Sequence, residues 1–418
     1  MRHAMTMPAR TGWRHRVALL GLVLAMPVHA ANDLRLDQVV MVYRHGVRSP
    51  LPGEIQVDDV HGAAWPAWPV PPSILTPHGR EGVMAMARYD RAWMADAGLF
   101  PRDGCPAAGS VSIWANTDQR TIASGQAYGD AFAPGCGLTV GHRPQDSTDP
   151  LFNPVAAGAV GWDGRAALSS IRQATGGPDA LTDRHREAMT TFARVMGCKP
   201  GDTPPVCQPA TWKGHLGLSD DGKSLTLDGP IAVTSGTAEA ILMAYLQGMP
   251  PDQVAWGRFD PAAFRALSQL HALLFDVHAR PTYVAERVAA LLGKRIATLL
   301  DDPNGPRLAV FVGSDNHIVA LASRLGIHFQ LPGYAKDDPP VGGAFVITVW
   351  RSGDGKRYVR TAYEAQAPDQ LRQLQVLDLA HPPVRQALVP EACRADPSRC
   401  ELGTLTETLR RSNVGAGP

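Results

Sequence analysis

The stretch VVMVYRHGVRSPLPG, residues 39–53, joins an apolar run to a dense group of cations. The run ends at Tyr43, and Arg44, His45 and Arg48 follow at once. A buried strand that ends in positive charge is unfavourable unless an anion binds there. Arginine keeps its charge at any usable pH, and its planar fork matches the oxygens of a phosphate. The stretch therefore predicts a site for a phosphoryl group with a histidine beside it.

Two further polar groups stand where apolar runs end. Arg120 follows the run at 110–116, and Asp315 follows the run at 307–313. Both runs are apolar and without alternation, which predicts buried strands. Ligands of open parallel sheets bind outside the carboxyl ends of the strands. We therefore expect one crevice that holds a histidine, three arginines and a carboxylate.

Each of these side chains also has an ordinary structural role. A single arginine at a strand end often forms a surface ion pair of small energetic value, and a single aspartate there often caps a helix. Their occurrence together at three strand ends favours a functional explanation. No second histidine pairs with a carboxylate at the spacing of metal ligands, so we expect neither a metal nor another cofactor.

The order of the elements predicts an α/β fold. Residues 76–100 carry apolar side chains near helical spacing, with Thr76 as the expected cap. Residues 119–133 predict a second helix directly after a strand. Strand–helix–strand–helix order is typical of a mostly parallel, doubly wound sheet flanked by helices. Two late runs, GGAFVITVWRS and KRYVRTAYEA, predict a hairpin.

The middle of the chain is richer in helical patterns and in loops. We therefore expect an α/β domain from residues 31–150 and 285–418, interrupted by an inserted, mainly α-helical domain at 151–284. Within the insertion, GLSDDGKS at 217–224 matches a phosphate-binding loop by its letters. No buried strand precedes it and a Gly-Pro pair stops any helix after it, so we interpret it as a hairpin turn.

Residues 1–30 predict a secretory signal peptide, with a basic start, the apolar run VALLGLVLAMPV and a small-residue cleavage site after Ala30. An uncleaved membrane anchor is the alternative. The run is too short to span a bilayer, and no later stretch is long enough. We therefore expect a periplasmic or secreted protein that has no membrane contact after cleavage. A net charge of +1 over 418 residues argues against nucleic acid as a partner.

Six cysteines agree with an oxidising compartment, because an even count behind a signal peptide is typical of disulfide-bonded proteins. Sequence alone allows about 15 pairings, and free buried thiols are the alternative. Two pairs lie close in sequence and suggest local links, which leaves the remaining two cysteines for each other: Cys198–Cys207, Cys393–Cys400 and Cys105–Cys136.

RHGVRSP resembles the RHGxRxP signature of the histidine acid phosphatases, in branch 2 of the histidine phosphatase superfamily. The segments LTPHG, ANTDQRTIASGQA, TDPLFNPV, PPDQVAWG and PPVGG are similar, in the same order, to bacterial periplasmic glucose-1-phosphatases and the related phytases. The cysteine spacing matches the family too. The resemblance covers nearly the whole mature chain and implies an α/β domain interrupted by an α-helical one.

By position, the resemblance implies that His45 takes the phosphoryl group as phosphohistidine, that Arg44, Arg48 and Arg120 hold it, and that Asp315 protonates the leaving oxygen. The three arginines should keep His45 neutral, and so nucleophilic, in acid.

The implied function is an exported acid phosphomonoesterase for sugar phosphates or inositol phosphates. It would act as a monomer or homodimer on a small-molecule substrate, without a cofactor. The alternatives are a non-hydrolytic phosphate or sugar-phosphate binding protein and a phosphotransferase. Export argues against the phosphotransferase, because such metabolism needs cytosolic phosphosugars.

The second motif departs from the family pattern, which has His-Asp where this chain has Ser314-Asp315. A histidine stands three positions later, at His317, where the family usually has asparagine. We expect His317 to contact the phosphate in place of the missing histidine. Ser314 could instead donate a weaker hydrogen bond, or the site could be impaired. The other interpretation of His317 is a cap or core residue under the following helix.

Overall fold

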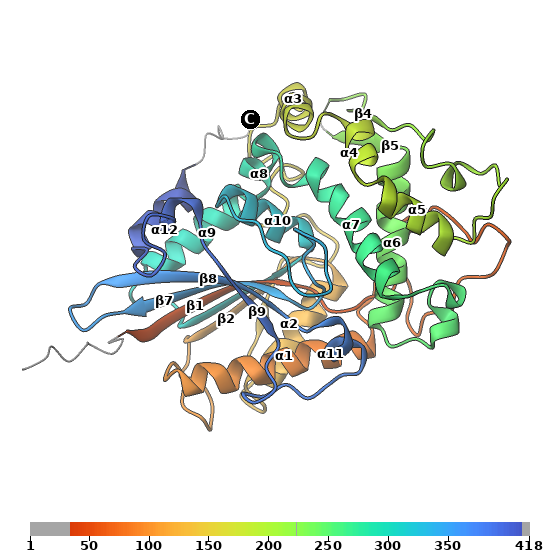
Figure 1. Ribbon diagram of the computed structural model, residues 1–418. Helices are drawn as coiled ribbons and strands as arrows, with labels where there is room; N and C mark the ends of the chain where they lie inside the picture. Colours follow the sequence, from red (N-terminus) through yellow and green to blue (C-terminus); the bar gives the residue numbers. More distant parts are fainter. Residues whose placement is uncertain (1–33, 223, 412–418) are drawn as a thin grey trace, which may run out of the picture. The chain divides into compact units, whose positions relative to one another are not determined.

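A seven-stranded sheet carries the three polar strand ends (Figure 1). The computed structural model describes residues 34–222 and 224–411, so the predicted signal peptide at 1–30 lies outside the described residues. The strands of this sheet, in spatial order, are β3 (Val140–Gly141), β2 (Val111–Ala115), β6 (Leu308–Gly313), β1 (Arg35–Arg44), β7 (Ala344–Arg351), β8 (Arg357–Ala365) and β9 (Val384–Leu388).

The sheet is parallel on one side and antiparallel on the other. The pairs β3–β2, β2–β6 and β6–β1 are parallel, whereas β1–β7, β7–β8 and β8–β9 are antiparallel. This arrangement confirms the α/β class, with four neighbouring strands parallel, and β7–β8 confirms the late hairpin. Strand β6 lies between β1 and β2, so the carboxyl ends of these three strands are neighbours.

Strand β1 is buried on both faces, which explains its uninterrupted apolar sequence. Val39, Met41 and Tyr43 pack into one cluster with side chains of helices α1 (Pro77–Asp96) and α2 (Gln119–Phe132). Val40 and Val42 face the other way. Figure 1 shows α1 and α2 on one face of the sheet and α9, α10 and α12 on the opposite face.

Both helices predicted beside the first strands are present. Thr76 is the N-cap of α1, and its side chain accepts a hydrogen bond from the backbone N–H of Gly79. The remaining α-helices are α3 (Gly164–Thr175), α4 (Pro178–Arg184), α5 (Arg186–Val195), α6 (Pro230–Leu246), α7 (Pro261–His278), α8 (Thr282–Val288), α9 (Ala290–Asp301), α10 (Asp315–Arg324), α11 (Pro368–Arg372) and α12 (Leu402–Arg410). Short 3-10 helices are η1 (Pro205–Cys207), η2 (Pro251–Gln253), η3 (Ala255–Gly257) and η4 (Glu391–Cys393).

The helices between β3 and β6 share an apolar core with the sheet. Ile241 of α6 and Leu267 of α7 belong to the same buried cluster as Val40 and Val42 of β1. The boundaries 151–284 of the inserted domain stay our proposal. The apolar core of this segment continues into the sheet.

Residues 217–222 and 224 lie in a hairpin, as predicted. Strands β4 (His215–Leu218) and β5 (Leu225–Asp228) pair antiparallel on either side of this turn. Helix α6 begins only afterwards, at Pro230. The segment therefore lacks the strand-to-helix geometry that a phosphate-binding loop needs.

All six cysteines form disulfides, in the three predicted pairs. They link Cys105 to Cys136, Cys198 to Cys207 and Cys393 to Cys400, across sequence separations of 31, 9 and 7 residues. Within the described part of the chain, the helices are all too short or too polar to cross a membrane.

Candidate active site

Backbone hydrogen bonds hold the three strand ends together. The N–H of His45 donates to the carbonyl of Gly313 at 3.1 Å, at the end of β6. The N–H of Asn116, just after β2, donates to the carbonyl of Val312 at 2.9 Å. The ends of β1, β2 and β6 are thus fixed relative to one another, and the polar residues that follow them come together as predicted.

Glycine is required at two positions where the RHG turn packs against helix α1. A Cβ on Gly46 would lie 2.6 Å from the carbonyl oxygen of Gly79, and a Cβ on Gly79 would lie 2.1 Å from that of Val47. The N-terminus of α1 therefore packs backbone to backbone against the turn. From the other side, the N–H of Gly46 donates to Oγ of Ser124 on α2 at 3.0 Å. These contacts explain why the LTPHG and ASGQA segments accompany RHGVRSP.

Three arginines carry buried donors that face no partner. Arg44, His45 and Arg48 are 2–4% exposed, and the Arg120 side chain is 12% exposed. The Nε atoms of Arg44, Arg48 and Arg120 are buried and have no hydrogen-bond partner among the described residues. Buried charged donors are normally paired, and an unpaired one is costly. Three of them around one histidine fit an oxyanion with several acceptor oxygens.

The terminal nitrogens of the same arginines are neutralised by carboxylates. Arg48 holds Glu54 in a two-pronged ion pair, at 2.7 Å for each nitrogen. The carboxylates lower the cost of burying three cations while the Nε side of each guanidinium stays unbonded. The pairs are Arg44 with Glu239 and, at 2.8 Å, with Asp315; Arg48 with Glu54; and Arg120 with Asp118 at 3.3 Å.

His45 is held as a neutral imidazole with one free lone pair. Burial lowers its pKa well below the usual value, and Arg120, Arg48 and Arg44 lower it further. Its Nδ1 lies 2.8 Å from the carbonyl oxygen of Gly46. A carbonyl can only accept, so Nδ1 carries the proton and the lone pair is on Nε2. An imidazole nitrogen with a free lone pair can act as a nucleophile.

Asp315 stands at the start of α10, 2.8 Å from the Arg44 guanidinium. Burial tends to raise its pKa, but Arg44, His271 and His45 outweigh that effect and bring the pKa well below its usual range. Its side chain is 19% exposed, so this edge of the site meets solvent. Asp315 is therefore ionised before a substrate binds.

The first turn of α10 uses one ring nitrogen of His317, whereas Nε2 is buried and has no hydrogen-bond partner among the described residues, so the expected contact with a phosphate stays a prediction. Nδ1 of His317 accepts a hydrogen bond from the backbone N–H of Ser314 at 2.9 Å, which makes His317 part of the cap of α10. The ring is buried and packs against Phe152, with centroids 5.2 Å apart. Burial lowers its pKa to about 4, so it is neutral over most of the acid range. We therefore interpret His317 as a structural cap and Ser314 as the N-cap residue.

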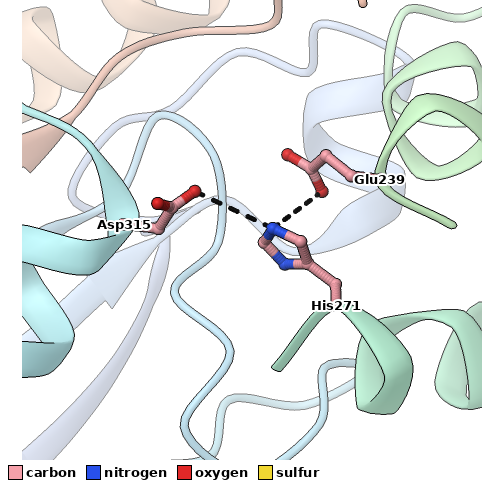
Figure 2. Close-up of side chains that lie close together, drawn as sticks. All are labelled: Glu239, His271 and Asp315. Carbon is pink, nitrogen blue, oxygen red and sulfur yellow. Dashed lines mark ion pairs between the residues drawn. The ribbon is translucent and has the colours of Figure 1, made fainter. Parts of the chain in front are cut away.

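A second histidine does lie at the site, and the sequence analysis missed it. His271 of α7 points toward Glu239 of α6 and Asp315 (Figure 2). Its Nδ1 lies 2.7 Å from a carboxylate oxygen of Asp338, in the segment before β7. His271 lies in an apolar helical pattern that predicts core. The only local signal was Glu239, the single charged residue of α6.

Glu239, His271 and Asp315 could in principle ligate a metal, since their polar atoms lie within 4.8 Å of one another. However, the Arg44 guanidinium already bonds to both carboxylates. Two of the three groups are thus already satisfied by a cation of the chain itself. A metal ion here would have to displace Arg44.

Comparison with known proteins places this geometry in a family. The model of the histidine phosphatase superfamily (branch 2) matches residues 35–188. The phytase AppA of Escherichia coli is 31% identical over 412 residues, which cover 92% of this chain and 93% of the relative. A glucose-1-phosphatase of Salmonella typhimurium is 30% identical over 394 residues, covering 91% and 94%.

Solved structures agree with the sequence comparison. The phytase of Hafnia alvei in complex with tartrate superimposes with a TM-score of 0.82 at 30% identity, covering 91% of this chain and 97% of that chain. A phytase from Citrobacter braakii gives 0.81 at 30% identity, covering 90% and 97%. The chain belongs to branch 2 of the histidine phosphatase superfamily, and within it the protein is a histidine acid phosphatase.

The cap at α10 gives a first prediction. Replacement of His317 by alanine should lower the free energy of unfolding by about 1–3 kcal/mol, because it removes a cap and leaves a cavity beside Phe152. KM for a phosphate ester should change less than twofold. Denaturant unfolding and steady-state kinetics on the same preparation measure both. His381→Ala, at an exposed position, is the control and should change neither. A large rise in KM with unchanged stability would show that His317 contacts the phosphate.

Proposed function

We propose that the protein is an exported acid phosphomonoesterase that hydrolyses sugar phosphates or inositol phosphates through a phosphohistidine on His45. The observation that carries the proposal is the set of unpartnered Nε–H groups on three buried arginines around a neutral histidine. The relatives named as phytase and glucose-1-phosphatase support this range of substrates.

In the first step, the Nε2 lone pair of His45 attacks phosphorus, and the P–O bond to the leaving group breaks. The leaving oxygen takes a proton from the carboxyl group of Asp315, so an alcohol departs instead of an alkoxide. The Nε–H groups of the arginines bond to the equatorial oxygens, where charge develops in a loose transition state. The terminal nitrogens of Arg48 and Arg120 keep their carboxylate partners, and Arg44 keeps Glu239.

In the second step, Asp315 acts as a base. It takes a proton from water, whose oxygen attacks phosphorus, and the P–N bond to His45 breaks. The products are inorganic phosphate and neutral His45, with the proton back on Asp315. The two steps thus balance in protons and electrons.

The electrostatics explain why the reaction would favour acid. His45 stays a free base below the usual histidine pKa of about 6.5, because its own pKa is depressed. Asp315 is ionised in the free site, so its proton has to arrive with the substrate. A phosphate monoester still carries one proton below about pH 6. When its oxygens engage Arg44, that guanidinium is withdrawn from Asp315, and the carboxylate can accept the substrate's proton.

Three disulfides support export to an oxidising compartment, together with the signal peptide predicted at residues 1–30. The periplasm is the compartment we propose. The partner is a small phosphate ester, and the site needs no cofactor for the two steps above.

The nucleophile is tested by replacing His45 with alanine. Phosphate release from an aryl phosphate should fall by about a thousandfold or more, since the covalent step is lost. The arginines remain, so inorganic phosphate should still bind, and circular dichroism should show an intact fold. Activity within tenfold of the wild type would rule out His45 as the nucleophile. Wild-type protein that binds phosphate but releases none from any ester would instead be a binding protein.

The proton donor is tested by Asp315→Asn. Turnover of an alkyl phosphate such as a sugar phosphate should fall by about 100- to 10,000-fold. Turnover of a nitrophenyl phosphate should fall far less, because a phenolate leaves without a proton. Asp118→Asn, which loosens Arg120 without touching the leaving group, should affect both substrates equally. An equal loss on both substrates for Asp315→Asn would show that Asp315 only binds phosphate or supports the fold.

A further inference from the structure

His271 is fixed in the site by groups from several elements. Its Nδ1 is 2.7 Å from Asp338, which also accepts a hydrogen bond from Ser268 one turn earlier on α7. The edge of its ring packs against Phe275, with centroids 5.0 Å apart. These contacts leave one ring nitrogen, Nε2, which faces Glu239 and Asp315 (Figure 2). Nε2 lies 3.5 Å from Glu239 and 3.8 Å from Asp315, which is too far for a strong hydrogen bond to either.

The surroundings of His271 favour its charged form. Burial alone would lower its pKa, but Glu239 on α6 and Asp338 before β7 outweigh burial and raise the pKa to about 9. Asp315 at the start of α10 adds a third carboxylate at 3.8 Å. Arg44 at the end of β1 opposes these effects. His271 is thus a buried imidazolium at any acid or neutral pH.

The phosphate site lacks the histidine that the resemblance implies at the second motif. Position 314, where the resemblance implies a histidine at the phosphate, holds serine, and Nδ1 of His317 is engaged in the cap of α10. We propose that protonated His271, clamped by Asp338, is the fourth cationic donor to the phosphate and takes over the part that a histidine at position 314 would play. This inference rests on the proposed phosphate site but not on its hydrolytic chemistry.

Binding follows from the geometry. A phosphate held by the arginine Nε atoms would bring acceptor oxygens to the side of Arg44 and Asp315, where Nε2–H of His271 lies 3.5 Å or more from either carboxylate and is free to turn to a new partner. The Asp338 carboxylate on Nδ1 keeps the ring charged and fixes its orientation, as carboxylates do for other functional histidines. Asp338 is therefore a positioning residue, and His271 is the group in contact.

The charge of His271 makes phosphate binding depend on pH. The folded-state pKa of His271 is raised above its ordinary value of 6.5, so its proton and the binding it provides are fully present below about pH 6.5. Both are lost as pH rises through about 9. Phosphate affinity should fall over that range in the wild type, and the step should be absent when position 271 cannot ionise.

The test is calorimetric binding of inorganic phosphate, which needs no turnover, to the purified disulfide-bonded protein at pH 5. His271→Gln should weaken phosphate binding by about 10- to 100-fold, the range for a lost charge-assisted hydrogen bond. In kinetics it should raise KM alike for alkyl and aryl esters, unlike Asp315→Asn. His185→Gln, a half-buried histidine bonded to the carbonyl of Leu181, is the matched control and should leave binding unchanged.

A rescue experiment tests whether His271 contacts the phosphate or only supports the fold. Adding Ser314→His to His271→Gln should restore at least half of the lost binding energy, because it returns a histidine to the family position. Binding within twofold of wild type for His271→Gln, or no recovery in the double variant, overturns the proposal.

If His271→Gln does not fold, nitrogen NMR of the wild type decides. Nε2 of His271 should stay protonated up to about pH 9 and shift when phosphate is added. Titration near pH 6.5, or no shift with phosphate, overturns the proposal. A protein that passes these tests but releases no phosphate would leave the contact intact and refute only the proposed hydrolysis.

Discussion

The structure depends on the burial of three arginines around one histidine. Cations in a protein interior are tolerated when carboxylates and hydrogen bonds compensate them. Here each guanidinium has a carboxylate on its terminal nitrogens and a free Nε–H on the other side. The arrangement has two consequences. It lowers the pKa of His45, which keeps the ring neutral, and it leaves arginine N–H donors free to bind an oxyanion. The chemistry we propose follows from these two consequences.

The order of the strands in the sheet makes this burial possible. Strand β6 enters between β1 and β2 from far along the chain, and the three carboxyl ends are joined by backbone hydrogen bonds. The close approach of α1 and α2 to the RHG turn fixes the backbone around His45. Helices α6 and α7 then supply Glu239 and His271 from the opposite side. The segment before β7 adds Asp338. The site is thus completed by residues from segments that lie far apart in the sequence.

The parts of this account that could be predicted from the sequence are those with a local pattern. An unbroken apolar run identified β1, and the polar residues after three such runs identified the arginines, His45 and Asp315. The cap role of His317 could not be predicted, because the letters show a histidine near a gap in a motif but not the direction of its ring, which the first turn of α10 uses for its own cap. His271 and Asp338 could not be found at all. They lie 67 residues apart, and the signal of each is lost in an apolar helix or a loop until the fold joins them.

The central claim is that phosphoryl transfer passes through a covalent bond to His45. Rapid mixing of the wild-type protein with a radiolabelled phosphate ester at acid pH, followed by quenching in base, tests it most directly. The account predicts a labelled peptide that contains His45, with a bond that survives base and is cleaved by acid, as a phosphorus–nitrogen bond is. Label that is stable in acid or lost in base would place the phosphoryl group on a hydroxyl or a carboxylate and contradict the account.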